Sequence, residues 1–496
     1  MTRALTRRTG GKGRFEDSGV DKRARADWYA GSGSLRGVRA MRIAAVILLG
    51  AIASPAAGAS NSSSVQVFVE QQRALNHIPG MAVAIVHKGR VEEHLAGVAN
   101  VEWQTPVTRD TRFQLASVTK LFTGVLVMRL VEAGKLDLDR SITNYLPEAP
   151  VSWKPITIRM LANHSSGIAE APEEWTPTTL KDVFDWTSTK PLDWIPGSQS
   201  RYGRNDFSIL ALAIERATRL RFEDALDRYL LAPAKLRSTG YAHLKQDGWV
   251  RTAQLLARRA PVYHWDGAQK SYEFLYPEPT YSAGGLYSTL ADMERLILAL
   301  QSGKLLRREH LALLTTAATL SDGTPGPFGI GWVVHTHHGV PVAGHTGGPA
   351  LADVSYYPDR QLAVIVLQNQ HRLYPWLSGA IVDKVIGLPA IKGILDSDPG
   401  LTAKTISALR ANASGTSEPR LWSGTAKAEF LPWFEADGRT LLRSMGAPRS
   451  AVLVGDKKSS NGRERTYSVT FSNATTRWIA TSNAAGELEA ITPADE

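Results

Sequence analysis

The fold is decided by the stretch Phe113-Gln-Leu-Ala-Ser117-Val-Thr-Lys120-Leu-Phe-Thr-Gly-Val-Leu-Val-Met-Arg-Leu-Val-Glu-Ala-Gly134. Its apolar residues recur at the spacing of one helical face, and a glycine stands at its C-terminal end, so it predicts an amphipathic helix. Ser117 lies near the start of this helix, and Lys120 follows one turn later on the same face. The stretch therefore brings a hydroxyl and an amine together at a helix N-terminus.

This pair has the elements of nucleophilic catalysis. A lysine at this spacing can accept the serine proton if burial lowers its pKa. The helix N-terminus adds a positive field and a free backbone N–H for a developing oxyanion. A single Ser-x-x-Lys pattern is common, however, and its ordinary interpretation is a helix cap followed by a solvated lysine. Support for the catalytic interpretation must therefore come from motifs elsewhere in the chain.

The segments around this helix predict an α+β domain. A helical pattern begins at Ser62, and a hairpin follows that turns at Lys88-Gly89. Residues 140–300 are mostly helical and rich in tryptophan. Two strand-like runs then flank a turn at His337-His338-Gly339, and two more, at 354–357 and 362–367, extend the sheet. Helices at both ends, with strands divided between them, favour a layered α+β domain over a doubly wound one.

The composition excludes several kinds of protein. The chain has 496 residues, no cysteine and a net charge of +10. Without cysteine there are no disulfides, no thiolate metal sites and no cysteine nucleophile. Ten basic and four acidic residues place +6 of the charge within residues 1–40. The remainder is close to neutral, so we expect no nucleic-acid partner.

The N-terminal region predicts export. Met41-Arg42 opens an apolar run, and Ser54-Pro-Ala-Ala-Gly-Ala59 has the small-residue pattern of a cleavage site. We therefore expect a signal peptide over residues 41–59 and a periplasmic or extracellular protein. The apolar run is about half of the roughly 20 residues that a spanning helix needs, which argues against a permanent membrane anchor. Residues 1–40 are either a disordered basic leader or the product of a start assigned too far upstream.

Further motifs accompany Ser117 in order along the chain. They are Gly134-Lys-Leu-Asp-Leu-Asp139 with Tyr145-Leu-Pro147, Ile156-Thr-Ile-Arg with Leu161-Ala-Asn-His-Ser-Ser-Gly167, Ala283-Gly-Gly-Leu-Tyr-Ser288 with Asp292, and Gly344-His-Thr-Gly-Gly348. Together with Phe113 to Lys120, this series resembles the serine β-lactamase-related family. That family includes class C β-lactamases, D-alanyl-D-alanine carboxypeptidases, D-aminopeptidases and esterases.

The resemblance runs from about residue 62 to about residue 390 and implies the β-lactamase and penicillin-binding-protein fold. In that fold an antiparallel sheet is flanked by helices and joined to a mainly helical lobe. We therefore expect a hydrolase domain over residues 60–391 and a linker over 392–420, where Ser, Asp, Thr, Ala and Gly dominate. Residues 421–496 predict a small α+β module, and it resembles accessory domains appended to some of these hydrolases.

The resemblance also implies roles for single residues. Ser117 matches the acylated nucleophile, Lys120 its proton acceptor, and Tyr202 the tyrosine that passes a proton to the leaving group. The Tyr-x-Asn motif of the family is altered, because Arg204 occupies the asparagine position and Asn205 follows one residue late. Arg204 could bind a substrate carboxylate or carbonyl, or it could be a solvated loop cation. No metal or other cofactor is implied.

The third motif is His345-Thr346-Gly347, where β-lactamases and carboxypeptidases usually carry Lys-Thr-Gly. A histidine is largely neutral at pH 7, so it offers less than a lysine to a substrate carboxylate. The histidine variant resembles esterases and aminopeptidases of the family. Gly347 and Gly348 allow a substrate to approach the strand, and we expect the N–H of Gly348 to be an oxyanion donor beside that of Ser117.

Other candidates have simpler interpretations. His335, His337 and His338 have a metal-like composition, but we expect a surface turn there, with no acid nearby to complete a metal site. His164 is expected to be architectural, and Trp194 to lie at the rim of the cleft.

The sequence thus predicts an exported serine hydrolase that forms an acyl-enzyme on ester or amide substrates, such as D-amino-acid peptides or β-lactam-like compounds. An esterase or a peptidase acting on D-amino acids is favoured over a true β-lactamase. The partner would be a small-molecule or peptide substrate, with the bacterial cell wall as one source. Two alternatives stay open: a penicillin- or peptidoglycan-binding protein with impaired turnover, and an acyltransferase.

Overall fold

The computed structural model describes residues 59–494, apart from 173–174, 176, 244, 248–249, 275, 349–350, 372–376, 387–390 and 460–461. The expected leader and nearly all of the expected signal peptide therefore lie outside the described residues. Among the helices that are described, none is long and apolar enough to cross a membrane.

The main sheet is antiparallel and has seven strands, in the order β11-β12-β13-β14-β1-β2-β3. Strands from the two ends of the domain meet at its centre, where Val83 pairs with Val366. The strands are β11 (Val333–His337), β12 (Val340–Gly347), β13 (Ala352–Tyr357), β14 (Leu362–Gln368), β1 (Gly80–His87), β2 (Arg90–Asn100) and β3 (Thr105–Pro106). The strands and hairpins expected from the sequence are present.

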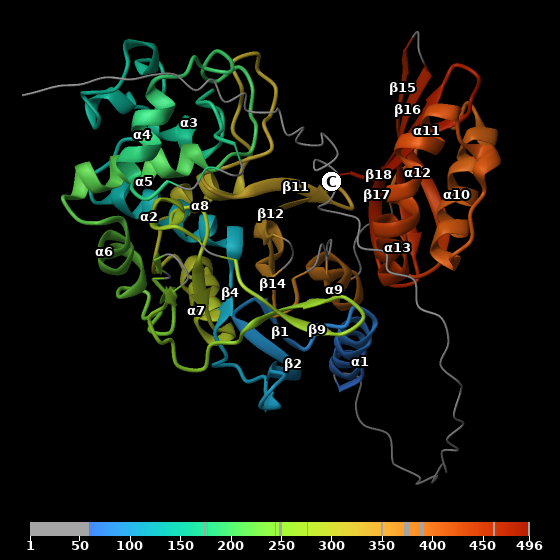
Figure 1. The fold of residues 1–496 in the computed structure, drawn as a ribbon, viewed down its shortest axis with the longest axis horizontal. Helices are drawn as coiled ribbons and strands as arrows, with labels where there is room; N and C mark the ends of the chain where they lie inside the picture. Colours follow the sequence, from blue (N-terminus) through green and yellow to red (C-terminus); the bar gives the residue numbers. More distant parts are fainter. Residues whose placement is uncertain are drawn as a thin grey trace, which may run out of the picture. The chain divides into compact units, whose positions relative to one another are not determined.

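Helices cover both faces of this sheet. Alternate residues of β1 belong to different hydrophobic clusters, because successive side chains of a strand point to opposite faces. On one face lie α1 (Ala59–Leu75) and α9 (Leu377–Val385), which Figure 1 shows close together. On the other lie α2 (Thr119–Glu132), α7 (Leu290–Gln301) and α8 (Arg308–Thr315). The predicted α+β class is confirmed.

The helical lobe and several short strands complete this domain. Its helices are α3 (Ile158–Ala162), α4 (Leu180–Ser188), α5 (Asn205–Thr218) and α6 (Phe222–Leu226). A three-stranded sheet joins β4 (Phe113–Gln114), β10 (Leu286–Ser288) and β5 (Gly240–Tyr241). Two hairpins are formed by β6 (Lys245–Asp247) with β7 (Val250–Thr252), and by β8 (Val262–Trp265) with β9 (Gln269–Tyr272).

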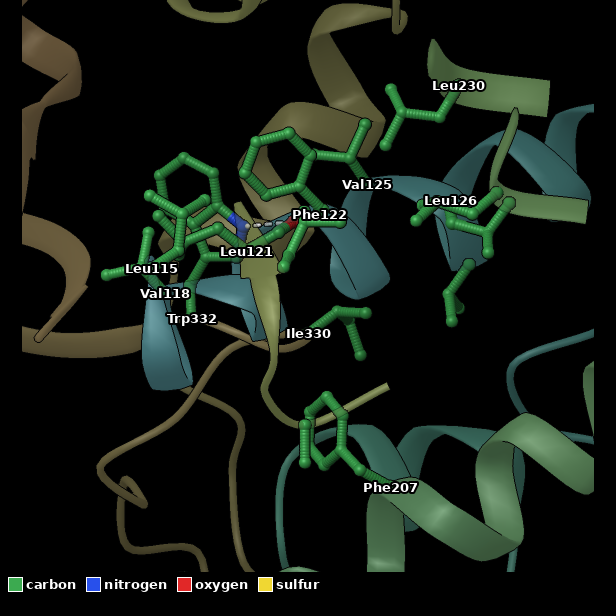
Figure 2. Packing of buried hydrophobic residues seen from close by; sticks show 14 of the residues in the cluster. Leu115, Val118, Leu121, Phe122, Val125, Leu126, Phe207, Leu230, Ile330 and Trp332 are labelled. Atoms are coloured by element: carbon green, nitrogen blue, oxygen red, sulfur yellow. Dashed lines mark hydrogen bonds between the residues drawn. The ribbon is translucent and has the colours of Figure 1, made fainter. Parts of the chain in front are cut away.

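Helix α2 is buried almost all round, which differs from the predicted amphipathic helix. All but three of its 14 residues are buried. The backbone oxygen of Ile330 lies 2.2 Å from where a Cβ on Gly124 would be, so this helix and the segment before β11 pack closely. Figure 2 shows Leu121, Phe122, Val125 and Leu126 of α2 within this core. The helix that carries Lys120 is therefore a central element of the domain.

The C-terminal part has a hydrophobic cluster of its own, with Trp422, Tyr467 and Trp478 among its buried residues. A four-stranded antiparallel meander is formed by β15 (Pro448–Ser459), β16 (Gly462–Phe471), β17 (Thr475–Asn483) and β18 (Leu488–Pro493). The helices before it are α10 (Pro399–Ser414), α11 (Gly424–Glu429), α12 (Leu431–Trp433) and α13 (Arg439–Met445).

Helix α10 lies within residues 392–420, where we predicted a linker, so that prediction is wrong for Pro399–Ser414. Asp398 caps the helix by accepting from the N–H of Leu401, and Gly415 ends it with φ at 86°. Leu401 and Leu409 are buried in the C-terminal cluster. Residues 399–414 did not indicate a helix because most of them are small or polar and few large apolar residues mark the buried face.

Candidate active site

Ser117 lies in a short helical turn, Ala116–Val118, between β4 and α2. The turn is fixed on both sides by Thr119, whose hydroxyl donates to the carbonyl of Ala116 at 2.6 Å and accepts from the N–H of Leu286 at 3.3 Å. Ala116 itself has a φ of 46°, in the left-handed region that non-glycine residues rarely adopt. This local geometry holds the serine at the N-terminus of a buried helix.

Tyr202 lies between the serine and the lysine. Its Oη donates to Ser117 Oγ at 2.8 Å and accepts from Lys120 Nζ at 2.7 Å. The direct separation of Lys120 Nζ from Ser117 Oγ is longer, 3.5 Å. Lys120 is only 2% exposed and also donates to the carbonyl of Ala283 at 3.0 Å. The structure thus brings Ser117, Lys120 and Tyr202 together and contradicts the interpretation of Lys120 as a solvated lysine.

Aromatic rings hold Tyr202 in place. The ring of His164 lies 4.9 Å from that of Tyr202, and the rings of Phe328 and His345 lie 6.1 and 5.7 Å away. His164 is buried, and its Nδ1 lies 3.3 Å from Asp206 Oδ2. This placement agrees with an architectural role for His164, because it supports the tyrosine without reaching Ser117 in any described contact.

Burial sets the charges around the tyrosine. Desolvation and the nearby Lys120 lower the pKa of both His164 and His345 to about 3. Burial raises the pKa of Asp206 to about 7. Both imidazoles are therefore neutral at pH 7, as we expected for His345.

The end of β12 lies against the turn that carries Ser117. β11 pairs with β12 only as far as Gly344, so His345–Gly347 have a strand partner on the β13 side alone among the described strands. A Cβ on Gly347 would lie 2.1 Å from the carbonyl oxygen of Leu115, so only glycine fits there. Thr346 and Gly348 line the adjoining cavity. The strand edge next to Ser117 is thus open to a substrate.

His345 faces this region with one nitrogen already used. Its Nδ1 lies 2.6 Å from the carbonyl of Thr346, to which a proton on that nitrogen donates. Its Nε2 is buried and has no hydrogen-bond partner in the described part of the chain. A neutral imidazole of this tautomer offers Nε2 as an acceptor.

Arg204 and Asn205 are held by the segment 169–171, which sequence reasoning did not identify. Arg204 Nε donates to Glu170 Oε1 at 3.0 Å, and the N–H groups of Arg204 and Asn205 donate to Glu170 Oε2 at 2.8 and 3.1 Å. The Asn205 amide donates to the carbonyl of Ala169 at 2.8 Å. Arg204 is therefore ion-paired and is not the solvated loop cation we considered. Glu170 carries no sequence signal, since it is a single acid between two alanines.

Two cavities, of about 430 and 490 Å³, share Ser117, Tyr202 and Gly348 in their walls. The walls of the first also include three aromatic residues, Trp175, Phe274 and Tyr276, together with Arg204 and Asn205. The second is lined also by Phe328, Val333, Val334, His335, His345 and Thr346. Trp175 lines the first cavity, whereas Trp194 is in the described wall of neither, so its expected position at the rim of the cleft stays a prediction.

Comparison with known proteins decides the family. A family model described as Beta-lactamase matches residues 65–375, which is more than half of the chain. The chain belongs to the β-lactamase family. The resemblance inferred from the motifs is confirmed, and the matched region contains Ser117, Lys120, Tyr202 and His345.

The relatives that match this chain include a β-lactamase, a penicillin-binding protein and an esterase. A β-lactamase of Escherichia coli (strain K12) is 28% identical over 236 residues, covering 47% of this chain and 58% of that protein. Penicillin-binding protein 4 of Amycolatopsis lactamdurans is 28% identical over 302 residues, covering 55% and 76%. Esterase EstB of Burkholderia gladioli is 26% identical over 359 residues, covering 64% and 91%. Of the β-lactamases that it matches, the chain spans about half the length.

Proposed function

We propose that this chain is an exported serine hydrolase that forms an acyl-enzyme on Ser117 and prefers ester substrates without a carboxylate near the reacting carbonyl. The observation that carries the proposal is the hydrogen-bonded chain from Ser117 through Tyr202 to Lys120, on the wall shared by two cavities. One cavity would hold the acyl group and the other the leaving group.

Acylation begins with a proton transfer from Tyr202. Its Oη first passes its own proton to the amine of Lys120, 2.7 Å away, and the resulting phenolate is stabilised by the ammonium so formed. Ser117 Oγ then attacks the substrate carbonyl carbon as its proton passes to the phenolate oxygen, 2.8 Å away. Tyr202 then protonates the leaving alcohol or amine, and the bond to the acyl carbon breaks. In this relay Lys120 acts on Ser117 through Tyr202, because Lys120 Nζ lies 3.5 Å from Ser117 Oγ.

The tetrahedral intermediate carries an oxyanion that needs donors. Ser117 lies at the N-terminus of α2, and Gly348 follows the open end of β12. We assign the backbone N–H groups of these two residues to the oxyanion. Water then attacks the acyl-enzyme, gives its proton to Tyr202, and Ser117 takes a proton back as it leaves. An added alcohol could replace water, which would make the same site an acyltransferase.

The substrate preference follows from the charges of the site. His345 is neutral where a lysine would offer a full positive charge to a carboxylate. Arg204 lines the aromatic cavity, but its guanidinium is paired with Glu170 at 3.0 Å. Neither residue presents an uncompensated cation, which favours neutral esters over penicillins. The esterase relative, of which 91% is covered, supports the same choice.

The test is intact-mass spectrometry of the purified chain after brief exposure to a short p-nitrophenyl acyl ester and, separately, to a penicillin. We expect the acyl mass on the wild-type chain and none on Ser117→Ala. Faster labelling by the ester would support the neutral substrate preference, whereas faster labelling by penicillin would contradict it. No adduct and no consumption of either reagent would reject the hydrolase and favour a binding protein.

Export is a separate part of the proposal and rests on the sequence of residues 41–59. Expression in a bacterial host followed by cell fractionation and N-terminal sequencing tests it. We expect the extracytoplasmic protein to begin at Ser60. An unprocessed protein confined to the cytoplasm would contradict it.

A further inference from the structure

The turn between β11 and β12 brings two histidines to one side. Neighbouring residues of a strand point to opposite faces, but His338 leaves the strand with a φ of 52°, and Gly339 follows at 76°. The imidazoles of His337 and His338 consequently meet edge to face, with ring centroids 4.6 Å apart. A left-handed turn of this kind is normally filled by Asn-Gly, so the histidine is an unusual choice.

A carboxylate from another element completes the group. Asp383 of α9 places Oδ1 3.3 Å from His337 Nε2 and 3.4 Å from His338 Nε2. The three side chains are 5%, 13% and 19% exposed in the order His337, His338 and Asp383. Our sequence prediction of a surface turn with no acid nearby is wrong, because α9 supplies the acid only after folding.

The spacing fits the coordination of a small divalent ion. A tetrahedral ion with bonds of about 2.0–2.1 Å separates its ligand atoms by about 3.3 Å. Both nitrogen-to-oxygen distances match this separation between ligand atoms, and all three ligand atoms lie within 4.8 Å of one another. Both oxygens of Asp383 are buried without a hydrogen-bond donor in the described part of the chain.

Neighbouring residues prepare the group for a cation. His337 Nδ1 lies 2.7 Å from Tyr357 Oη, so a proton on Nδ1 leaves the lone pair of Nε2 directed at the cluster. The one cation next to Asp383 along α9, Lys384, places its ammonium over the ring of Phe68 at 4.6 Å. Gly379, one turn before Asp383, has no side chain, and a Cβ there would already lie 3.4 Å from His337 Cε1.

We propose that His337, His338 and Asp383 bind a zinc ion, with water or another small ligand in the fourth position. Two imidazoles and a carboxylate are ligands that zinc prefers. His337 and His345 lie toward opposite ends of the β11–β12 hairpin, so the ion is separate from the Ser117 site. It joins the turn at one end of this hairpin to α9, on the face of the sheet away from α2 (Figure 1). Its role is to hold in place the end of β12 that follows the turn, because the opposite end of β12 lies against the Ser117 turn.

The decisive variant is His338→Asn. Asparagine accepts the left-handed backbone and suits the turn before Gly339, so it removes the ligand while retaining the fold. The matched control is His243→Asn, since His243 also has a positive φ of 45° and lies 3.2 Å from a carboxylate, that of Glu223. Asp383→Asn removes the anionic ligand as a second test.

The experiment loads the full chain with zinc chloride, removes free metal on a desalting column and measures bound zinc by mass spectrometry, with affinity from calorimetry. We expect one zinc per wild-type or His243→Asn chain and at least tenfold weaker binding in His338→Asn and Asp383→Asn. Zinc should also raise the melting temperature of the wild type, and EDTA should reverse this. No zinc on the wild type, or equal affinity in His338→Asn, would overturn the proposal. Because the readouts are binding and melting, their failure would leave the hydrolase proposal untouched.

Discussion

At the scale of single residues, Tyr202 is the centre of the proposed chemistry. It is the hydrogen-bonding partner of both Ser117 and Lys120, and the rings of His164 and His345 lie beside it. The sequence identified Ser117 and Lys120 through a local motif. It could not show that the tyrosine separates them, because that depends on a loop 82 residues from the lysine.

Removing the phenolic oxygen should therefore be almost as harmful as removing the lysine. We expect Tyr202→Phe to lower kcat/KM for a neutral ester by about 10²–10⁴-fold, because proton transfer loses its nearest acceptor. The retained ring keeps its packing against His164, so the circular dichroism spectrum and melting temperature should stay close to wild type. A variant with more than a tenth of wild-type activity would show that Lys120 acts on Ser117 directly.

His345 gives a prediction about substrate charge. Its pKa of about 3 makes it neutral at pH 7, so His345→Lys introduces a longer, cationic group at the end of β12. We expect kcat/KM for a carboxylate-bearing ester to rise at least tenfold relative to that for its neutral methyl ester analogue. The ratio of two substrates on one enzyme corrects for any general loss of activity. An unchanged ratio would mean that position 345 does not select substrate charge.

At the scale of elements, the sequence predicted helices and strands that have a periodic pattern, but it did not predict which of their surfaces tertiary packing buries. The hairpin at Lys88-Gly89 and the strands from 333 to 367 are present, because alternation and turn residues are local signals. The burial of α2 was not predicted, since its polar residues Thr119 and Thr123 bond to the distant segment 282–286. Likewise, Glu170 and Asp383 reach their partners only through tertiary packing.

The contact between β12 and the Ser117 turn provides an element-scale test. A Cβ on Gly347 would lie 2.1 Å from the backbone of Leu115, where no flexible side chain can yield. We expect Gly347→Ala to force the strand from the turn, lowering both the melting temperature and the acylation rate of Ser117. Gly348→Ala is the matched control for stability, because a Cβ there meets no atom within 4 Å. Equal melting temperatures for the two variants would contradict the close packing.

At the scale of the whole molecule, stability is linked to pH through buried groups beside the site. The pKa of Asp206 is raised from 3.8 to about 7 by burial, so the folded chain holds a proton that the unfolded chain has lost. This contribution is complete below pH 3.8 and is lost as the pH rises to about 7. His164 and His345 act in the opposite direction between pH 3 and 6.5, because burial lowers their pKa values. Two imidazoles oppose one carboxyl, so these three groups together favour greater stability toward pH 6.5.

Asp206→Asn separates these opposing effects, because both histidines remain and the amide oxygen can still accept from Ser166. The variant should gain stability relative to wild type as the pH rises from 4 to 7, by about 1.4 kcal/mol per pH unit at most, and the difference should level off above pH 7. Urea unfolding of both proteins at pH 4.5, 5.5, 6.5 and 7.5 measures it. A difference that does not change with pH would show that Asp206 is ionised throughout this range, so that the support beneath Tyr202 is charged.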